Sequence, residues 1–106
     1  MQFLVITRSR DALPPERALP LIEAAQAWVA EHRAAGRIHA LWSFAGTIGA
    51  VGVAEVKSPD ELDEMMSGFP FLSFSHVEVI ALSDMDRSLA NGKSQMERMM
   101  AMMGRK

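Results

Sequence analysis

The chain has 106 residues, of which 49% are hydrophobic and 23% are charged, and its formal net charge at pH 7 is −2. This composition is that of one ordinary globular domain without the positive charge of a nucleic-acid-binding surface. Because the chain contains no cysteine, disulfides, thiolate metal sites and cysteine nucleophiles are excluded. No apolar run approaches the roughly 20 residues that span a membrane, and no secretory signal is visible, so we predict a cytoplasmic protein.

The first third of the chain predicts a strand followed by a long helix. Residues 2–8 form a short apolar run with β-branched residues, which is typical of a strand. A proline-containing loop leads to a predicted helix over residues 16–35, and Gly36 ends it in the position that glycine favours after a helix. The residues expected to face the core recur at helical spacing: Leu19, Ile22, Ala25 (or Gln26) and Val29.

The middle of the chain predicts a hairpin and a second helix. Residues 37–44 and 50–56 read as antiparallel strands joined by a glycine-containing turn. Ile38, Ala40, Trp42 and Phe44 are expected on one face of the first of these strands, and His39, Leu41 and Ser43 on the other. The helix is predicted over residues 59–67, with Ser58 as its N-cap and Glu61 completing a capping box. Its inward residues are predicted to be Leu62, Met65 and Met66.

A final strand is predicted from Phe74 to about Ser83. Successive side chains of a strand alternate between faces, so Val77, Val79 and Ala81 form an apolar face that suits packing against helices. The opposite face is expected to carry Phe74, His76, Glu78 and Ile80.

This element order is β-α-β-β-α-β, the ferredoxin-like α+β pattern, which predicts a four-stranded antiparallel sheet with both helices on one face. Right-handed crossovers are expected to place the first and fourth strands in the middle. Trp42, Phe44 and Phe74 would leave an apolar patch on the other face. We therefore predict that a second copy covers this face, giving a two-fold dimer with a barrel and a chamber between the subunits.

Residues 1–83 are predicted to form this domain, and residues 84–106 a tail. The tail ends in a predicted helix with methionines on one face: Met96, Met99, Met100 and Met103. A helix this short is marginal in water, so we expect it to dock on a neighbouring subunit; the alternative is a frayed terminus.

Two segments, LWSFAG (residues 41–46) and FPFLSFSHVEV (residues 69–79), resemble the muconolactone Δ-isomerase family. The similarity extends over about residues 2–82. The positions in register with the family pattern are Gly36, Leu41, Trp42, Ala45, Gly46, Val56, Ser58, Leu62, Pro70, Val77, Glu78 and Val79. The resemblance implies a ferredoxin-like protomer, a dimeric α+β barrel within a higher oligomer, and a cofactor-free proton shift on an unsaturated lactone.

The chain departs from the family at its polar positions. Ile6 stands where the family usually has a carboxylate. His39 and Ala40 stand where it has Arg-His before the Leu-Trp pair, and Ser43 stands where it has an arginine after that pair. The polar run that follows Ala-Gly in the family is replaced by residues 47–51, TIGAV, and His76 replaces an acidic residue. A site without these arginines is poorly suited to the carboxylate of muconolactone, so we expect a different, mostly apolar substrate.

Three residues are candidates for proton transfer. His76 and Glu78 share a strand face and lie about 7 Å apart along it. A histidine beside a carboxylate in a dry cavity can act as acid or base near neutral pH, and the alternative is a hydrogen-bonding pair at a surface or interface. His39 is either a second acid/base or a partly exposed strand histidine.

Four further residues are predicted to bind substrate: Trp42, Ser43, Arg8 and Phe74. Arg8 and Ser43 would orient a carbonyl or carboxylate, and Trp42 would stack on a flat ligand. The alternatives are a solvated Arg8 and a Trp42 that packs in the core.

The sequence therefore supports three functional hypotheses. The first is an isomerase-like enzyme without metal or cofactor, which performs a proton shift, cyclisation or elimination on a small carbonyl or lactone compound in a specialised or secondary metabolic route. The second is a non-catalytic oligomeric module that binds a small molecule or recruits a partner. The third is a cofactor-free oxygenase, which rests on analogy of fold alone.

Overall fold

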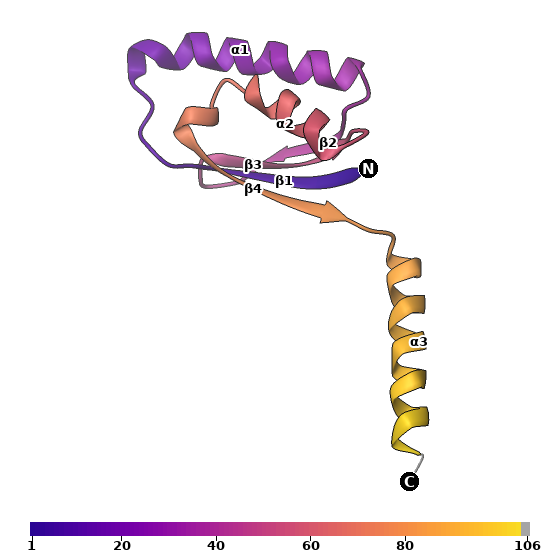
Figure 1. The fold of residues 1–106 in the computed structure, drawn as a ribbon. Helices are drawn as coiled ribbons and strands as arrows, with labels where there is room; N and C mark the ends of the chain where they lie inside the picture. Colours follow the sequence, from indigo (N-terminus) through magenta and orange to yellow (C-terminus); the bar gives the residue numbers. More distant parts are fainter. Residues whose placement is uncertain (105–106) are drawn as a thin grey trace.

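A computed structural model describes residues 1–104, and the predicted element order is present in it (Figure 1). The ferredoxin-like part comprises four strands and two helices, and a short 3₁₀ helix, η1, precedes the last strand. The bounds in chain order are β1 Gln2–Ser9, α1 Pro15–Ala34, β2 Ile38–Ser43, β3 Gly49–Glu55, α2 Pro59–Ser67, η1 Leu72–Phe74, β4 Ser75–Leu82 and α3 Met85–Met103. The predicted α+β fold class is thereby confirmed.

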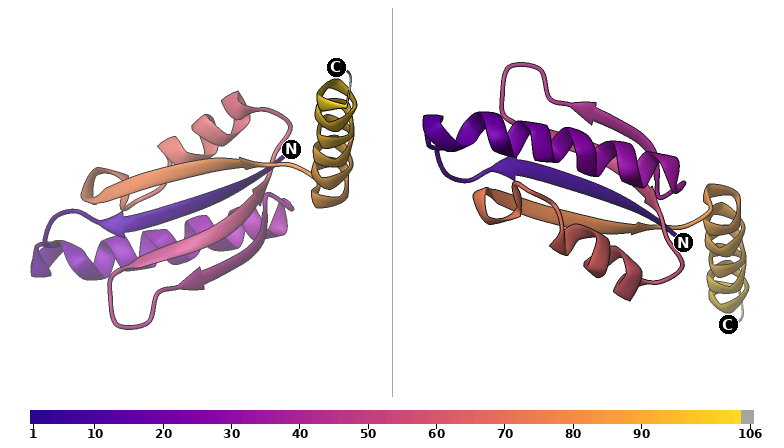
Figure 2. Two further views of the ribbon diagram at one scale, coloured as in Figure 1. Left: turned by 90° about the horizontal axis from the view of Figure 1, so that it is seen from below. Right: turned by 90° about the horizontal axis from the view of Figure 1, so that it is seen from above.

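The sheet has the strand order β2-β3-β1-β4, and every neighbouring pair is antiparallel. The predicted pairing of β1 and β4 is correct, but the expectation that these two strands are central is wrong. β1 and β3 are central and β4 is an edge strand. The reason is that the crossover from β3 through α2 delivers β4 to the edge of β1 that β3 leaves free. Both helices cover one face of the sheet, and the other face is open (Figure 2).

The core lies between the sheet and α2. Its buried residues are Phe3, Ala54, Val56, Leu62, Met65 and Met66. The three residues predicted to face inward from α2 are all among them, so this prediction is confirmed. Burial of a leucine or methionine side chain of this kind contributes about 1.5–3 kcal/mol to the stability of the fold.

The predicted inward face of α1 is right for Ala25 and Val29, which are half-buried, and wrong for Leu19 and Ile22. Leu19 and Ile22 are 64% and 47% exposed, whereas Trp28 packs against the core and His32 is buried. The Trp28 indole N–H donates to the carbonyl of Met65 at 3.2 Å. Large aromatic rings dominate packing, and satisfying this buried donor fixes the rotation of the helix about its axis. Pro20 lies inside α1 without ending it.

The helix ends follow the sequence signals. Gly36 has φ 77° directly after the C-terminus of α1, a conformation that costs other residues more than glycine. At α2 the Ser58 hydroxyl accepts from the Glu61 N–H at 3.1 Å, as a capping box requires. The Glu61 carboxylate accepts from the Lys57 N–H at 3.0 Å, one residue earlier than the motif predicts.

A bulge in β2 changes the predicted faces of that strand. Ile38 is paired with Ala54, and Ala40 is paired with Val53, so two steps on β2 oppose one on β3. Ile38 therefore packs against the core on the helix side. Trp42 pairs with Val51 on the open face. The prediction that Ile38, Ala40 and Trp42 share one face is wrong for Ile38.

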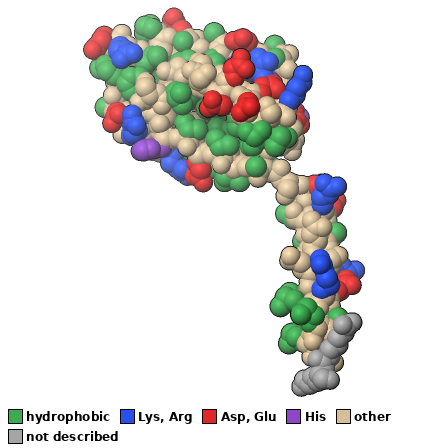
Figure 3. All heavy atoms as spheres, viewed as in Figure 1, with side chains coloured by type: hydrophobic (Ala, Val, Ile, Leu, Met, Phe, Trp, Pro, Cys, Tyr) green, Lys and Arg blue, Asp and Glu red, His purple; other side chains and the backbone are tan. Residues whose placement is uncertain are grey.

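The described part of the tail is a single helix that projects from the domain (Figure 1). α3 makes no extensive contact with any other described element, and every residue from Met85 to Met103 is exposed. Apolar side chains gather near its C-terminal half in the space-filling view (Figure 3). The open face of the sheet is likewise uncovered, with Trp42 59% exposed and Ile80 41% exposed.

Candidate functional site: a cavity between sheet and helices

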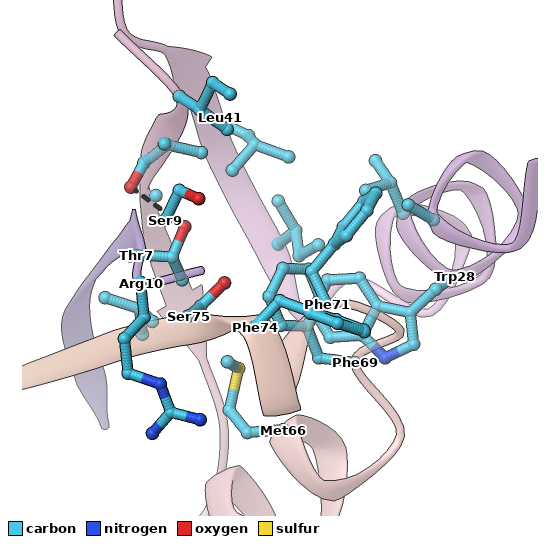
Figure 4. A pocket seen from close by; sticks show the side chains of 18 of the residues that line it. Thr7, Ser9, Arg10, Trp28, Leu41, Met66, Phe69, Phe71, Phe74 and Ser75 are labelled. Carbon is cyan, nitrogen blue, oxygen red and sulfur yellow. Dashed lines mark hydrogen bonds between the residues drawn. The ribbon is translucent and has the colours of Figure 1, made fainter. Parts of the chain in front are cut away.

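An apolar cavity of about 530 Å³ lies between the sheet and the helices of the single chain (Figure 4). Small-molecule sites in proteins have volumes of about 300–1,000 Å³ and mostly hydrophobic walls, so the space suits a small ligand. Its floor comes from the helix-facing residues of β1, β2 and β3, and its roof from α1, α2 and the segment before β4. Its lining includes Thr7, Ser9, Arg10, Asp11, Trp28, Leu41, Gly52, Phe69, Phe71, Phe74 and Ser75.

One wall of the cavity is aromatic. Trp28 and Phe69 have ring centroids 5.1 Å apart, and Phe69 and Phe71 have centroids 6.0 Å apart at a steep angle. Phe74 follows in η1, where the guanidinium carbon of Arg17 lies 5.3 Å from its ring centroid. Such a wall is suited to a flat, unsaturated molecule.

Hydroxyl groups lie across from the aromatic wall (Figure 4). Thr7 and Ser9 alternate with outward residues on β1, and Ser75 is paired with Ser9. Ser9 Oγ donates to the carbonyl of Asp11 at 3.2 Å, and Thr7 Oγ1 reaches the carbonyl of Ala50 only at 3.5 Å. A hydroxyl with so long a bond can reorient, so this side of the cavity can donate to a ligand carbonyl.

Arg10 and Asp11 follow β1 and bring charge to the cavity lining. The Arg10 N–H donates to the carbonyl of Phe74 at 2.7 Å, and its Nη2 donates to the carbonyl of Ser73 at 2.8 Å. Its Nε lies 3.4 Å from Oδ2 of Asp11. Arg10 thus joins the end of β1 to η1, and the Asp11 carboxylate, 63% exposed, lies beside it.

Of the predicted site residues, Phe74 lines this cavity. It does so because η1 takes it out of the strand alternation that was expected to place it beside His76. Ser43 is paired with Ala50 on the helix side but is exposed and does not line the cavity. His39 lies in the β2 bulge and is exposed.

The other predicted site residues lie on the open face. Arg8 is paired with His76, and Arg8 Nη1 lies 3.5 Å from Oε1 of Glu78. The two side chains of this ion pair are 60% and 56% exposed, so it contributes at most about 1 kcal/mol. Trp42 is on the same face across β1 and β3. The sheet therefore separates this group from the cavity.

Sequence reasoning did not single out Thr7, Ser9, Arg10, Asp11 and Ser75. The alternation of β1 contains Thr7 on the same face as Phe3 and Val5, which was a usable signal for a polar group on the buried side. The loop after β1 carried no such signal in the sequence. Its position over the cavity depends on the hydrogen bonds from Arg10 to residues far along the chain.

A second hollow, more open and polar, lies beside the end of α1. His32 is buried there, and its Nδ1 accepts a hydrogen bond from Arg37 Nε at 2.8 Å. Burial, and then the positive charge of Arg37, lower the pKa of His32 from its ordinary value. The imidazole ring also meets Trp28 edge-on, with centroids 4.7 Å apart. His32 is therefore a buried residue that accepts from Arg37 on one side and packs against Trp28 of the aromatic wall on another.

Within residues 1–104, no group of three or more histidine, aspartate or glutamate side chains is arranged to hold a metal ion. None of the helices in the same range is long and apolar enough to cross a membrane.

Known proteins share this architecture. A family model described as muconolactone delta-isomerase matches residues 1–87. The crystal structure of muconolactone isomerase matches with a TM-score of 0.73 and 22% sequence identity, covering 79% of this chain and 90% of that chain. The structure of 5-chloro-2-hydroxyhydroquinone dehydrochlorinase from Burkholderia phenoliruptrix AC1100, in complex with 2,5-dihydroxybenzoquinone, matches with a TM-score of 0.61 and 18% identity, covering 82% and 98%. No curated protein sequence matches. The resemblance predicted from the sequence is confirmed.

Proposed function

The chain belongs to the muconolactone delta-isomerase family, and we propose that it is a cofactor-independent enzyme that binds a small, mostly apolar carbonyl compound. The reaction is a proton shift, cyclisation or elimination. The observation that carries this proposal is the apolar cavity of about 530 Å³, which has an aromatic wall and facing hydroxyl groups. The two solved relatives are named for an isomerase and a dehydrochlorinase, and both names describe chemistry on small molecules.

The cavity favours a neutral substrate. Arg10 is the cationic side chain of its lining, and its guanidinium is already held by the Ser73 carbonyl and the Asp11 carboxylate. A ligand carboxylate would have to displace one of these partners. A lactone, quinone or unsaturated ketone needs only hydroxyl donors for its carbonyl oxygen, and Thr7, Ser9 and Ser75 can supply them.

We propose Asp11 as the proton carrier. It is the acidic residue of the cavity lining, and a carboxylate beside a bound carbonyl compound can remove a proton from carbon and return it elsewhere. The Thr7, Ser9 and Ser75 side would stabilise the negative charge that develops on the carbonyl oxygen. His76 and Glu78 on the open face, and His39 in the β2 bulge, remain the competing candidates.

Solvent exchange tests the reaction without knowledge of the product. Unsaturated lactones and quinones are incubated in deuterated buffer with the protein, and deuterium entry at carbon is followed by NMR. Asp11→Asn is expected to reduce the exchange rate by about 100-fold or more. The matched variant His76→Gln/Glu78→Gln is expected to leave it unchanged. The reverse pattern would move the reacting site to the open face.

The open face favours a second copy as its cover. Trp42, Ile80 and Leu82 are 59%, 41% and 40% exposed there, and a soluble protein rarely leaves so continuous an apolar surface uncovered. We therefore propose a two-fold dimer through this face. Trp42→Glu is expected to convert the dimer to a monomer in sedimentation experiments, whereas Ile48→Glu, at a more exposed residue in the β2–β3 turn, is not.

The second candidate function is ligand binding without turnover. One observation favours it: the ionisable side chains that line the cavity, Arg10 and Asp11, are 49% and 63% exposed in the ion pair they share, and the remaining lining residues carry no ionisable group. A binding module would show saturable quenching of Trp28 fluorescence by a neutral quinone together with no deuterium exchange. The enzyme would show both.

A further inference from the structure

α3 lies almost entirely beyond the part of the chain that matches the family model. The match covers residues 1–87, and α3 extends from Met85 to Met103. The helix leaves the end of β4 and projects clear of the sheet and both other helices in all three views (Figures 1 and 2). Its function is therefore not accounted for by the cavity or by the shared fold.

α3 carries an apolar seam with coiled-coil spacing. The seam residues are separated alternately by four and three positions, which is the a/d pattern of a heptad repeat. They are Met85, Leu89, Gly92, Met96, Met99 and Met103. The five large seam side chains are each more than half exposed, and no seam position carries a charged residue.

The helix needs a partner to be stable. It contains Ser88, Asn91, Gly92 and Ser94, which are poor helix formers, and an isolated helix of this length is marginal in water. One favourable feature is its N-cap, where the Asp84 carboxylate accepts from the Arg87 N–H at 2.9 Å. A cap contributes about 1 kcal/mol, which does not offset the ordering of 19 residues.

We propose that α3 pairs with α3 of a second copy through this seam. The same surface on both chains is self-complementary, as a two-fold interface requires. When the helices run antiparallel, Gly92 of one lies opposite Met96 of the other. The long, flexible methionine side chain then fills the space that glycine leaves open. The projection of α3 away from the domain lets two copies meet along the helices (Figure 1).

The charges of α3 favour a protein partner over a lipid surface. The polar faces carry two acidic side chains, Asp86 and Glu97, among three basic ones, Arg87, Lys93 and Arg98. A helix that lies on an anionic membrane has a polar face rich in lysine and arginine. The seam covers fewer than three heptads, so the pairing is weak by itself and depends on protein concentration.

The assembly mass tests the seam. In the full chain, Met96→Glu places a charge in the seam, and Ala101→Glu places the same charge on the outer face of the same helix. Sedimentation over a wide range of protein concentration is expected to show the largest assembly halved in mass for Met96→Glu and unchanged for Ala101→Glu. Equal masses for both variants would overturn the proposal. The Trp28 fluorescence of both should match the wild type, which separates this test from the cavity.

Cross-linking identifies the partner surface. The chain has no cysteine, so Leu89→Cys/Met99→Cys introduces thiols only into the seam. Oxidation is expected to give a covalent dimer, because these positions meet in a helix pair, and not to do so for the outward pair Ala90→Cys/Ala101→Cys. Failure of the seam thiols to cross-link, or binding of the wild type to anionic phospholipid vesicles with loss of the assembly, would overturn pairing of α3 with α3.

Discussion

Arg37 donates its Nε–H to Nδ1 of His32 at 2.8 Å, and this bond joins the last turn of α1 to the residue before β2. Protonation of His32 would remove the acceptor and place a second positive charge beside the guanidinium. The pKa of His32 is accordingly lowered, first by burial and then by Arg37, with Glu31 acting in the opposite direction. The folded state therefore binds this proton less readily than the unfolded chain does.

The first prediction is a loss of stability on mild acidification. The unfolded chain protonates His32 near pH 6.5, whereas the folded chain does so only at a lower pH. The contribution of neutral His32 to the free energy of unfolding is therefore fully present above pH 6.5 and is lost as the pH falls below that value. Urea denaturation at a series of pH values measures this. His32→Asn keeps an acceptor for Arg37 but does not titrate. The free energy of unfolding of this variant should therefore fall less steeply with decreasing pH than that of the wild type. The Glu55 carboxyl, whose pKa is lowered by the hydrogen bond from the N-terminal amine, titrates at lower pH. Equal slopes for wild type and His32→Asn would contradict the prediction.

The second prediction concerns the N-cap of α2. Ser58→Ala leaves the Glu61 N–H without its partner and should lower the free energy of unfolding by about 1 kcal/mol, whereas Ser58→Asp should retain most of it. Thermal unfolding followed by circular dichroism measures the difference. Because α2 supplies three core residues, the loss should appear in the single main transition; a change confined to local fraying would contradict it.

The third prediction contrasts two glycines. A Cβ at Gly52 would lie 2.9 Å from Leu41 Cδ1 and 3.1 Å from the Ala40 carbonyl, so Gly52→Ala should destabilise the domain by about 1–3 kcal/mol. A Cβ at Gly92, inside α3, meets nothing within 4 Å, and Gly92→Ala should stabilise the helix by about 0.5–1 kcal/mol. Melting temperature reports the first and helical circular dichroism the second. Similar effects from both substitutions would show that the cavity floor is not tightly packed at Gly52.

The fourth prediction uses the two tryptophans as separate reporters. Trp28 packs on the cavity wall and donates to Met65, whereas Trp42 is 59% exposed on the open face. In Trp42→Phe, the remaining emission should be blue-shifted and quenched by a neutral quinone. In Trp28→Phe, the remaining emission should be insensitive to the quinone and shift to the blue as protein concentration rises and the open face is covered. A Trp28 signal unaffected by any quinone or lactone tried would argue against a ligand site in this cavity.

The sequence was informative where a pattern is local and less so where a side chain chooses its partner over a long distance. The bounds and inward face of α2 follow from Ser58, Pro59 and the spacing of Leu62, Met65 and Met66, which act within one helix. The rotation of α1 depends on Trp28 reaching Met65, a contact between segments 37 residues apart. The apolar spacing therefore placed Ala25 and Val29 correctly, since both line the cavity, but placed Leu19 and Ile22 wrongly.

The candidate site shows the same division. Alternation along β4 correctly assigned His76 and Glu78 to one face and Val77 to the other. Alternation does not say which face borders a ligand cavity, and the cavity within the chain lies on the helix side. Phe74 lines this cavity from η1 and not from the strand position that was predicted for it, because η1 turns the chain just before β4.

The bulge between Ile38 and Ala40 makes His39 the extra residue of β2. Loss of the codon for His39 would restore one-to-one pairing with β3, and Ile38 and Trp42 would stay on opposite sides of the sheet. The aliphatic anchor would remain in the interior and the indole would remain outside. An in-frame deletion should therefore be tolerated better at His39 than at Leu41, whose side chain is needed under the helices.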